Sequence, residues 1–315
     1  MRLFKDASYK FIQQRRKAYV VSAAGLLVGI AAMIFFAATG SGWVNYGVDF
    51  TGGTIIQVEF AESQTVGDVR DALGTMEGVE ITQFGDDTEY LIRVPEFSEQ
   101  GTNVSEVLSA ILAEEYGDDG YQVVRTEAVG PKIGAELQQR ALLAILLSFG
   151  LTLIYLAFRF EWKFGVAAVI ATVHDILIAL GFIALFRIEV SLSLVAAILT
   201  VIGYSLNDTI VVFDRIRENL GSKGRSEAYT DLVNRSINDT LPRTIMTSVT
   251  TLVVLLSLFL LGGDIIRDFA LILILGVLVG TYSSIFVASP ALLEIEQRSG
   301  EEGQTRTRGR AAARA

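Results

Sequence analysis

Six long blocks of this 315-residue chain are almost entirely apolar, and polar segments separate them. Each block holds about 18–24 residues, and at a rise of ~1.5 Å per residue a helix of that length crosses a ~30 Å hydrocarbon core. The blocks predict six transmembrane helices, at residues 18–38, 141–158, 164–186, 190–213, 244–262 and 269–289. We interpret the first as a retained helix rather than a cleaved signal peptide, because it is longer than a signal-peptide core and no clear cleavage site follows it.

Lysine and arginine residues are concentrated in the segments that six spans place on one side of the membrane. These segments are residues 1–17, the turn at 159–163, the loop 214–242 and the tail 290–315. Because short cytoplasmic segments carry an excess of positive residues, this side is predicted to be the cytoplasm, with both termini there. The tail is polar and rich in glycine and arginine, so we expect its end to be disordered.

The segment 39–140 then lies on the opposite, external side. Its pattern predicts strands at 54–60, 79–84, 89–94 and 121–129 and helices at 65–76 and 104–116. Thr65 and Asp68 fit a capping box, and Gly85-Asp86-Asp87 fits a hairpin turn. The order β-α-β-β-α-β is that of a ferredoxin-like α+β domain. This segment holds no histidine, no cysteine and no phosphate-binding loop, so we expect a packing or partner-binding domain.

Two further patterns predict how helices pack. Tyr229, Leu232, Val233, Ile237 and Leu241 recur at helical spacing between residues 221 and 241. They predict an amphipathic helix that lies on the cytoplasmic membrane surface. Small residues recur every four positions on the sixth span, at Gly276, Gly280 and Ser284, which predicts close helix packing there.

Composition excludes several kinds of chemistry. The chain has no cysteine, so it forms neither disulfides nor thiolate metal sites. It has one histidine and no HExxH motif, which argues against a zinc enzyme. We therefore expect no enzymatic activity, no cofactor and no metal site.

Polar residues inside the predicted spans are the strongest functional signal, because a charge in hydrocarbon costs at least ~2.5–3.5 kcal/mol. His174 and Asp175 lie near the middle of the third span, and Asp208 lies about two turns (~11 Å) inside the cytoplasmic end of the fourth. Polar neighbours are Tyr204, Ser205 and Asn207 on the fourth span, and Arg243, Thr247, Ser248, Thr250 and Thr251 on the fifth.

These residues fit an ion or proton relay. A carboxylate in a low-dielectric site favours its protonated form, whereas a nearby arginine favours the charged form. Moving Arg243, or admitting water, would then load or release a proton at Asp208. Structural alternatives stay open: Arg243 could extend to the membrane surface from its helix start, and His174 with Asp175 could form a satisfied interhelical hydrogen bond. Asp214, at the membrane edge, is expected to be topological or structural.

Three long motifs resemble those of the SecD/SecF family of protein-export membrane subunits. They are YGVDFTGGT at residues 46–54, GYSLNDT at 203–209 leading into FDRIREN at 213–219, and TLPRTIMTS at 240–248. The first motif contains Asp49, Gly52 and Gly53 and looks like the family signature that follows the first helix. The others are similar to the fourth-helix and fifth-helix motifs of the SecF branch. The resemblance runs to about residue 297, and the size of the single external domain favours SecF over the larger SecD.

The resemblance implies a fold related to resistance–nodulation–division (RND) transporters, in which six-helix SecD and SecF halves pair around a pseudo-twofold axis. It implies a protein of the bacterial inner membrane that assists export through the SecYEG channel by using an H⁺ or Na⁺ gradient. The partners that it implies are SecD, SecYEG, YajC, translocating preproteins and the lipid bilayer, with no nucleic acid. In the family, the residues that match Asp208 and Arg243 are the functionally critical pair, and Asn207 adjoins the first of them.

Three other interpretations belong to different classes. Half of a small-molecule or lipid exporter would need a much larger external domain than segment 39–140. An intramembrane protease would need a GxSG or GxGD motif, which is absent around Ser205, Asp175 and Asp208. A structural assembly subunit without its own ion coupling stays open.

Overall fold

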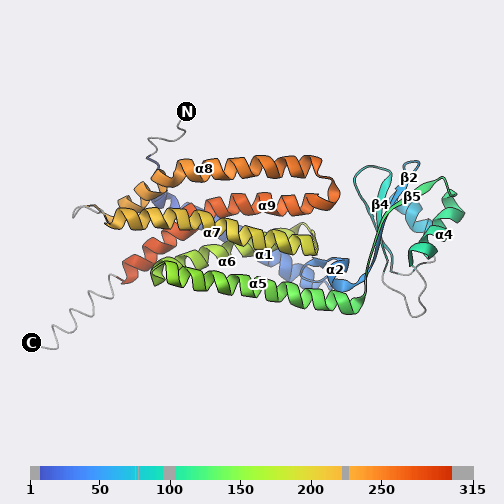
Figure 1. Cartoon of the computed structure of the whole chain (residues 1–315), viewed down its shortest axis with the longest axis horizontal. Coiled ribbons are helices and arrows are strands. Elements are labelled where there is room, and N and C mark those ends of the chain that lie inside the picture. The colour runs from blue at the N-terminus through green and yellow to red at the C-terminus, as the bar shows by residue number, and fades with distance from the viewer. Residues whose placement is uncertain (1–7, 75, 77, 95–103, 222–226, 300–315) are drawn as a thin grey trace, which may run out of the picture.

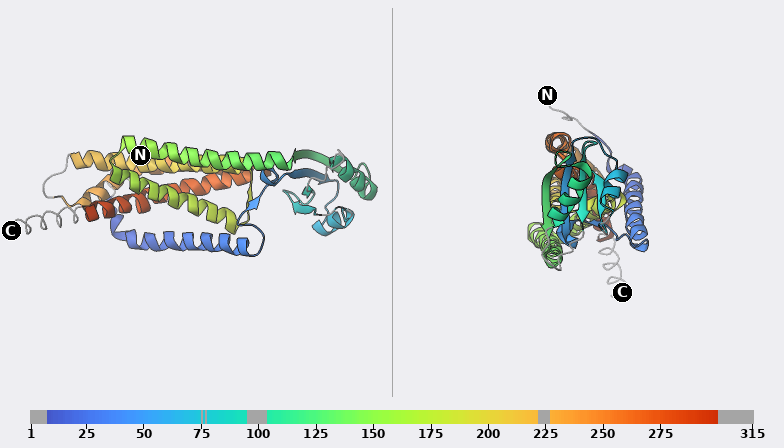
Figure 2. Two further views of the ribbon diagram at one scale, coloured as in Figure 1. Left: turned by 90° about the horizontal axis from the view of Figure 1, so that it is seen from below. Right: turned by 90° about the vertical axis from the view of Figure 1, so that its right-hand side faces the viewer.

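The computed structural model describes residues 8–74, 76, 78–94, 104–221 and 227–299, which form a long helix bundle with a small α+β domain at one end (Figure 1). The end of the tail, predicted to be disordered, lies outside the described residues. The first helix begins, and the last helix ends, at the end of the bundle far from the domain (Figure 2). We call this the terminal end and the opposite one the domain end.

Six helices of the described residues are long and apolar enough to span a membrane, as predicted. They are α1 (Arg15–Ala38), α5 (Pro131–Arg159), α6 (Trp162–Leu185), α7 (Leu192–Gly221), α8 (Tyr229–Leu261) and α9 (Asp264–Ser283). A 3-10 turn η1 (Ile12–Gln14) precedes α1, and a π-helical segment η2 (Ser284–Ala288) continues α9. α6, α7 and α9 form the centre of the bundle, whereas less than a fifth of the most apolar stretch of α1, α5 and α8 is buried.

The α+β domain lies between α1 and α5. It consists of β2 (Gly53–Phe60), α3 (Val66–Ala72), β3 (Glu80–Gln83), β4 (Glu89–Val94), α4 (Val104–Tyr116) and β5 (Tyr121–Val129). The sheet order is β3-β4-β2-β5, and every neighbouring pair is antiparallel. β4 therefore separates the two strands that α3 connects, and β2 separates the two that α4 connects. This split β-α-β arrangement confirms the ferredoxin-like prediction.

The domain has its own apolar core between the sheet and α3 and α4. Its fully buried members include Ile56, Val58, Tyr90, Leu108 and Leu112. The predicted capping box at the start of α3 is present, since the Asp68 amide donates to Thr65 Oγ1 at 3.1 Å and the Thr65 amide donates to Asp68 Oδ2 at 3.0 Å. Hydrogen bonds from Thr65 hold the pKa of Asp68 below its ordinary value.

Close approach between helices depends on glycine at two places. A Cβ added at Gly276 would lie 2.1 Å from Val201 Cγ2, and one at Gly280 would lie 3.0 Å from the Cα of Ser205, so α9 packs directly on α7. This confirms the packing predicted from the small residues of the sixth span. The sequence did not predict a second such contact, where a Cβ at Gly29 of α1 would lie 2.7 Å from the Cα of Gly181 on α6.

The prediction of a surface helix at residues 221–241 is wrong. α8 is one helix of 33 residues that begins at Tyr229 and passes through Pro242. The apolar face of its first turns, with Leu232, Val233 and Ile237, is buried in the core of the bundle rather than exposed to lipid. Hydrophobic periodicity alone does not distinguish a membrane surface from a protein interior.

Candidate ion-coupling site

Asp208 lies inside the helix bundle, on α7, with 2% of its surface exposed. The Thr281 hydroxyl on α9 donates to Asp208 Oδ2 at 3.4 Å. Ser248 Oγ on α8 lies 2.7 Å from Thr281 Oγ1, and the Tyr204 hydroxyl donates to Ser248 Oγ at 3.5 Å. A chain of hydroxyl groups therefore links this buried carboxylate to both neighbouring helices.

Two polar residues flank Asp208 on the surface of the bundle. Arg243 follows Pro242 in α8 and is exposed, and it is close enough to Asp208 for a favourable charge interaction. No direct ion pair joins these two described residues. Asn207 is also exposed, and it lines a groove of about 490 Å³ together with Thr152 and Tyr155 of α5. The site thus combines a buried carboxylate with a cation and an amide at the bundle surface.

His174 and Asp175 form a second buried cluster. His174 Nδ1 lies 2.7 Å from Asp175 Oδ1, and the hydroxyls of Ser205 and Ser283 donate to Asp175 Oδ2 at 2.5 and 2.6 Å. Asp175 therefore joins α6, α7 and α9. Among the described residues, no hydrogen bond connects this cluster to Asp208, so the structure separates residues that the sequence grouped into one relay.

Most of the hydroxyl stripe on α8 bonds within its own helix. Thr247 Oγ1 donates to the Arg243 carbonyl at 2.9 Å, and Thr251 Oγ1 donates to the Thr247 carbonyl at the same distance. Thr250 bonds likewise to the carbonyls of residues 246 and 247. The predicted relay role of Thr247 therefore has no contact to support it, whereas Ser248 reaches α9.

Sequence reasoning missed Thr281 and Ser283, which place α9 in both clusters. Both precede the π-helical segment η2, whose first residue, Ser284, is fully buried. π-helical segments occur frequently at functional sites, because they shift the helix face that a side chain occupies. The available sequence signal was the run of small and hydroxyl residues at 280–284.

The first family motif lies at the domain end of the bundle. Asp49 belongs to the short helix α2 (Val48–Thr51), and its Oδ2 accepts a hydrogen bond of 2.8 Å from the Leu192 amide, at the start of α7. Gly52 and Gly53 have φ angles of 76° and 122°, which favour glycine. A Cβ at Gly52 would also lie 2.8 Å from the Cα of Pro131, so these glycines let the entry to the domain pack against the start of α5.

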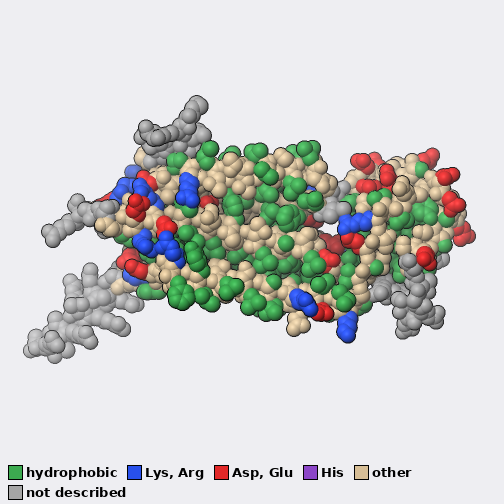
Figure 3. Space-filling model, viewed as in Figure 1, with side chains coloured by type: hydrophobic (Ala, Val, Ile, Leu, Met, Phe, Trp, Pro, Cys, Tyr) green, Lys and Arg blue, Asp and Glu red, His purple; other side chains and the backbone are tan. Residues whose placement is uncertain are grey.

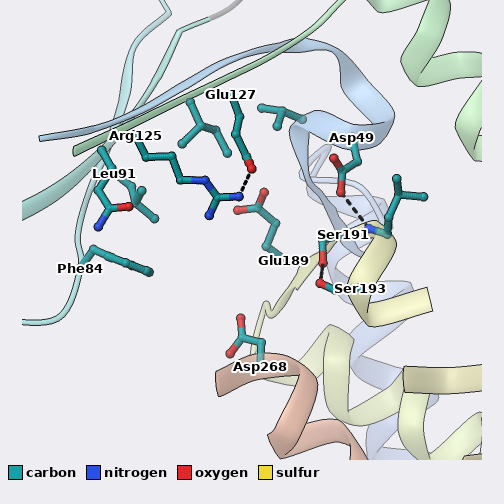
Figure 4. A pocket seen from close by; sticks show the side chains of 13 residues that line it. Asp49, Phe84, Leu91, Arg125, Glu127, Glu189, Ser191, Ser193 and Asp268 are labelled. Carbon is teal, nitrogen blue, oxygen red and sulfur yellow. Dashed lines mark hydrogen bonds and ion pairs between the residues drawn. The ribbon is translucent and has the colours of Figure 1, made fainter. Parts of the chain in front are cut away.

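A cleft of about 370 Å³ separates the open face of the sheet from the domain end of the bundle. Figure 4 shows Arg125 and Glu127 of β5 on one side and Asp49, Glu189 and Ser191 on the other.

At the terminal end, Asp214 pairs with Arg159 at 2.8 Å, which fits the structural role expected for it. In the described part of the chain, no group of three or more histidine, cysteine, aspartate or glutamate side chains is arranged to hold a metal ion.

Comparisons with known proteins place this architecture in a family. Residues 109–298 match the model "Protein export membrane protein SecD/SecF, C-terminal", and residues 40–64 match "SecD/SecF GG Motif". Protein translocase subunit SecF of Gemmatimonas aurantiaca is 47% identical over 306 residues, which cover 95% of this chain and 90% of that protein. Protein translocase subunit SecDF of Thermus thermophilus is 42% identical over 301 residues, covering 93% of this chain and 39% of that protein.

A solved structure agrees with the sequence comparisons. The crystal structure of SecDF from Thermus thermophilus, described as a translocon-associated membrane protein, matches with a TM-score of 0.81 and 41% identity. The match covers 94% of this chain and 40% of the crystallised one, so this chain spans less than half of SecDF. The six-helix bundle with one inserted domain is therefore that of the SecD/SecF export proteins. Within that family, this chain belongs to the SecF subunits.

Proposed function

We propose that this chain is the SecF half of an export accessory complex, and that Asp208 couples the transmembrane ion gradient to protein translocation. The observation that carries the proposal is the buried carboxylate of Asp208, held by Thr281 in the centre of the bundle with Arg243 nearby. A charge in such a place is costly, so the carboxylate favours a bound proton or cation. Binding and release of that ion would change the charge at the contact between α7 and α9.

Either H⁺ or Na⁺ fits the site as the coupling ion. The carboxylate can take up a proton, and its oxygens with the hydroxyls of Thr281 and Ser248 are the hard ligands that a small cation prefers. Arg243 supplies a positive charge that competes with either ion. Its approach or withdrawal would therefore set when the ion is bound.

A SecD partner is the second part of the proposal. Asn207 and Arg243 are exposed on helices long and apolar enough to span a membrane, and a lipid-facing amide and guanidinium are unfavourable. SecDF of Thermus thermophilus is more than twice as long as its match to this chain, which leaves room for a SecD half. We propose that SecD covers these polar groups, and that the pair assists preproteins at SecYEG, with YajC as a further partner.

The proposed orientation places the terminal end, with both termini, in the cytoplasm of the bacterial inner membrane. Figure 3 shows lysine and arginine side chains gathered near the terminal end, while the surface of the α+β domain carries mostly aspartate and glutamate. This distribution follows the positive-inside rule. A reporter inserted at Gly117, in the domain, should be accessible from outside, and one at Gly221 only from inside; the reverse would refute the orientation.

The proposed function is tested by Asp208→Asn in vesicles that contain the native partners. Asparagine keeps the shape of the side chain but does not titrate. We expect normal assembly with SecD and loss of the component of export that depends on the ion gradient. Full gradient-dependent export would instead favour a structural subunit in which SecD carries all ion coupling.

A further inference from the structure

The link between α6 and α7, residues 186–191, is bound to the segment that leads from α1 into the α+β domain. β1 (Asn45–Tyr46) and β6 (Glu189–Val190) form a parallel two-stranded sheet, although more than 140 residues separate them. The Gly47 amide donates to the Val190 carbonyl at 2.9 Å. A Cβ at Gly47 would lie 2.5 Å from Glu189 Oε1, so glycine is what permits this approach.

The Asp49 carboxylate fastens this contact to α7 itself. Its Oδ2 accepts from the Leu192 amide at 2.8 Å (Figure 4). Ser191 Oγ accepts from the Leu194 amide at 3.2 Å. The start of α7 thus has one cap from the adjacent Ser191 and a second from Asp49 of the family motif. A carboxylate at a helix start bonds a free backbone amide and lies at the positive end of the helix dipole, so the contact is favourable on both counts.

The domain makes a second contact with the same link. Arg93 of β4 forms an ion pair with Glu189 and donates to the Tyr46 carbonyl at 3.4 Å. Burial raises the pKa of Glu189, and Arg93 partly offsets that rise. On the far side of the link, Arg187 donates to the carbonyls of Ser41 and Gly42 at 2.8 and 3.0 Å.

The backbone of this link is held in a defined conformation. Arg187 has a φ angle of 52°, which is uncommon for a residue other than glycine. α7 then runs from Leu192 to Gly221 as one helix of 30 residues. Asp208 is 16 residues beyond Leu192, or ~24 Å along the helix axis. A displacement of α7 at Asp208 therefore reaches Leu192 through a single stiff element.

The chain segments that connect the domain covalently to α1 and α5 are less suited to transmitting a movement of α7 to the domain. Gly40 and Gly42, with φ angles of 81° and 71°, interrupt the path from α1 to the domain. α5, which leaves the domain through Pro131, lies at the outside of the bundle with few buried residues. The cleft beside β5 also leaves space between the sheet and the bundle.

We propose that Asp49, together with the Arg93–Glu189 ion pair, fastens the α+β domain to the start of α7, so that movement of α7 reaches the domain. This inference rests on the proposed ion coupling at Asp208 and assigns a transmitting role to residues at the domain end of α7. We call these contacts the α7 clamp. Asp49 positions the domain against the start of α7, and these contacts are kept while the domain and α7 move together.

The test measures domain position in the complete complex with SecD. This chain has no cysteine, so spin labels at Ala110→Cys on α4 and Val28→Cys on α1 are the only labels that it carries. Both positions are exposed. Distances between them are measured by pulsed electron paramagnetic resonance, with and without an ion gradient. We expect a gradient-dependent shift that Asp208→Asn abolishes and Asp49→Ala reduces.

Two controls separate transmission from loss of a helix cap. Asp49→Asn keeps an oxygen for the Leu192 amide and should retain the shift. Asp68→Ala removes a capping carboxylate within the domain, away from α7, and should also retain it. We expect Asp49→Ala to lower gradient-dependent export about fivefold, the factor that loss of one helix cap represents.

The outcomes distinguish this proposal from the proposed function. A shift that Asp49→Ala leaves undiminished but Asp208→Asn abolishes overturns the clamp and leaves the ion site intact. A shift of the same size with Asp208→Asn contradicts the ion site itself. Absence of any shift in the labelled complex that carries neither Asp208→Asn nor Asp49→Ala overturns the clamp. A disulfide between Tyr46→Cys and Val190→Cys, paired across β1 and β6, should leave export active; loss of export on oxidation would show that the junction has to open.

Discussion

The Thr281 hydroxyl donates a hydrogen bond to the Asp208 carboxylate, and this contact joins α9 to α7 in the centre of the bundle. Ser248 extends it to α8, the helix that carries Arg243. One carboxylate is therefore linked directly to α9 and, through Thr281, to α8. A change in its charge state alters contacts on α7 and α9 together, which is what an ion-driven helix movement requires.

Thr281→Val should change ion binding at Asp208 about tenfold, because a hydrogen bond to a charged group contributes ~1.5 kcal/mol or more. Binding should tighten if the coupling ion is H⁺, because the charged carboxylate loses a donor, and weaken if it is Na⁺, because the cation loses a ligand. Valine keeps the shape of threonine and removes its hydroxyl. The measurement is the ion concentration that gives half-maximal export stimulation. Thr281→Ser keeps the hydroxyl and should behave normally; if serine and valine have equal effects, the hydroxyl is not the cause.

Arg243→Met should abolish most gradient-dependent export while leaving assembly with SecD intact. Methionine retains much of the apolar length of arginine but removes the cation that stabilises charged Asp208. Arg243→Lys keeps the charge and should retain part of the activity. Export rates with and without the gradient measure this effect, and a fully active Arg243→Met protein would leave arginine with a membrane-surface role.

Asp175→Ala should destabilise the bundle rather than act on coupling alone. It leaves His174, Ser205 and Ser283 without their shared acceptor, and breaking such a buried network costs ~3–5 kcal/mol. The thermal unfolding midpoint of the purified complex measures this loss. Asp175→Asn keeps one acceptor and should be milder. Normal stability with lost coupling in both variants would instead support the relay interpretation of His174 and Asp175.

Gly276→Ala should weaken packing between α7 and α9, because the added Cβ meets Val201 Cγ2 at 2.1 Å. A second substitution, Val201→Ala, removes the opposing methyl groups and should restore part of the lost stability. Gly150→Ala on α5 is the matched control, since nothing lies within 4 Å of its added Cβ. Equal unfolding midpoints for Gly276→Ala and Gly150→Ala would contradict the close packing.

The sequence predicted the features that follow from local periodicity. Apolar runs identified the six spans, strand and helix patterns gave the β-α-β-β-α-β order, and small residues every four positions predicted close packing at Gly276, which the structure shows to be against α7. Contacts between distant segments could not be predicted in this way. Asp49 with Leu192, and Thr281 with Asp208, depend on which helices become neighbours, and no local pattern specifies that.

The surface helix predicted at residues 221–241 failed for a related reason. Leu232 and Ile237 have the spacing of an apolar face whatever covers it. Polar neighbours carried the missing information, because Asn234 and Asn238 accept hydrogen bonds from the Ile12 and Tyr9 amides at 3.0 and 2.9 Å. Their role became visible only when the N-terminal segment was placed beside α8.

Ion flux tests the central claim, coupling at Asp208, most directly. The complex of this chain with SecD is reconstituted in liposomes, and uptake of H⁺ and of Na⁺ is followed separately during preprotein translocation. We predict uptake of one of these ions by the unmodified complex, and none above background with Asp208→Asn in a correctly assembled complex. Undiminished ion uptake with Asp208→Asn would contradict the account and assign ion conduction to the partner.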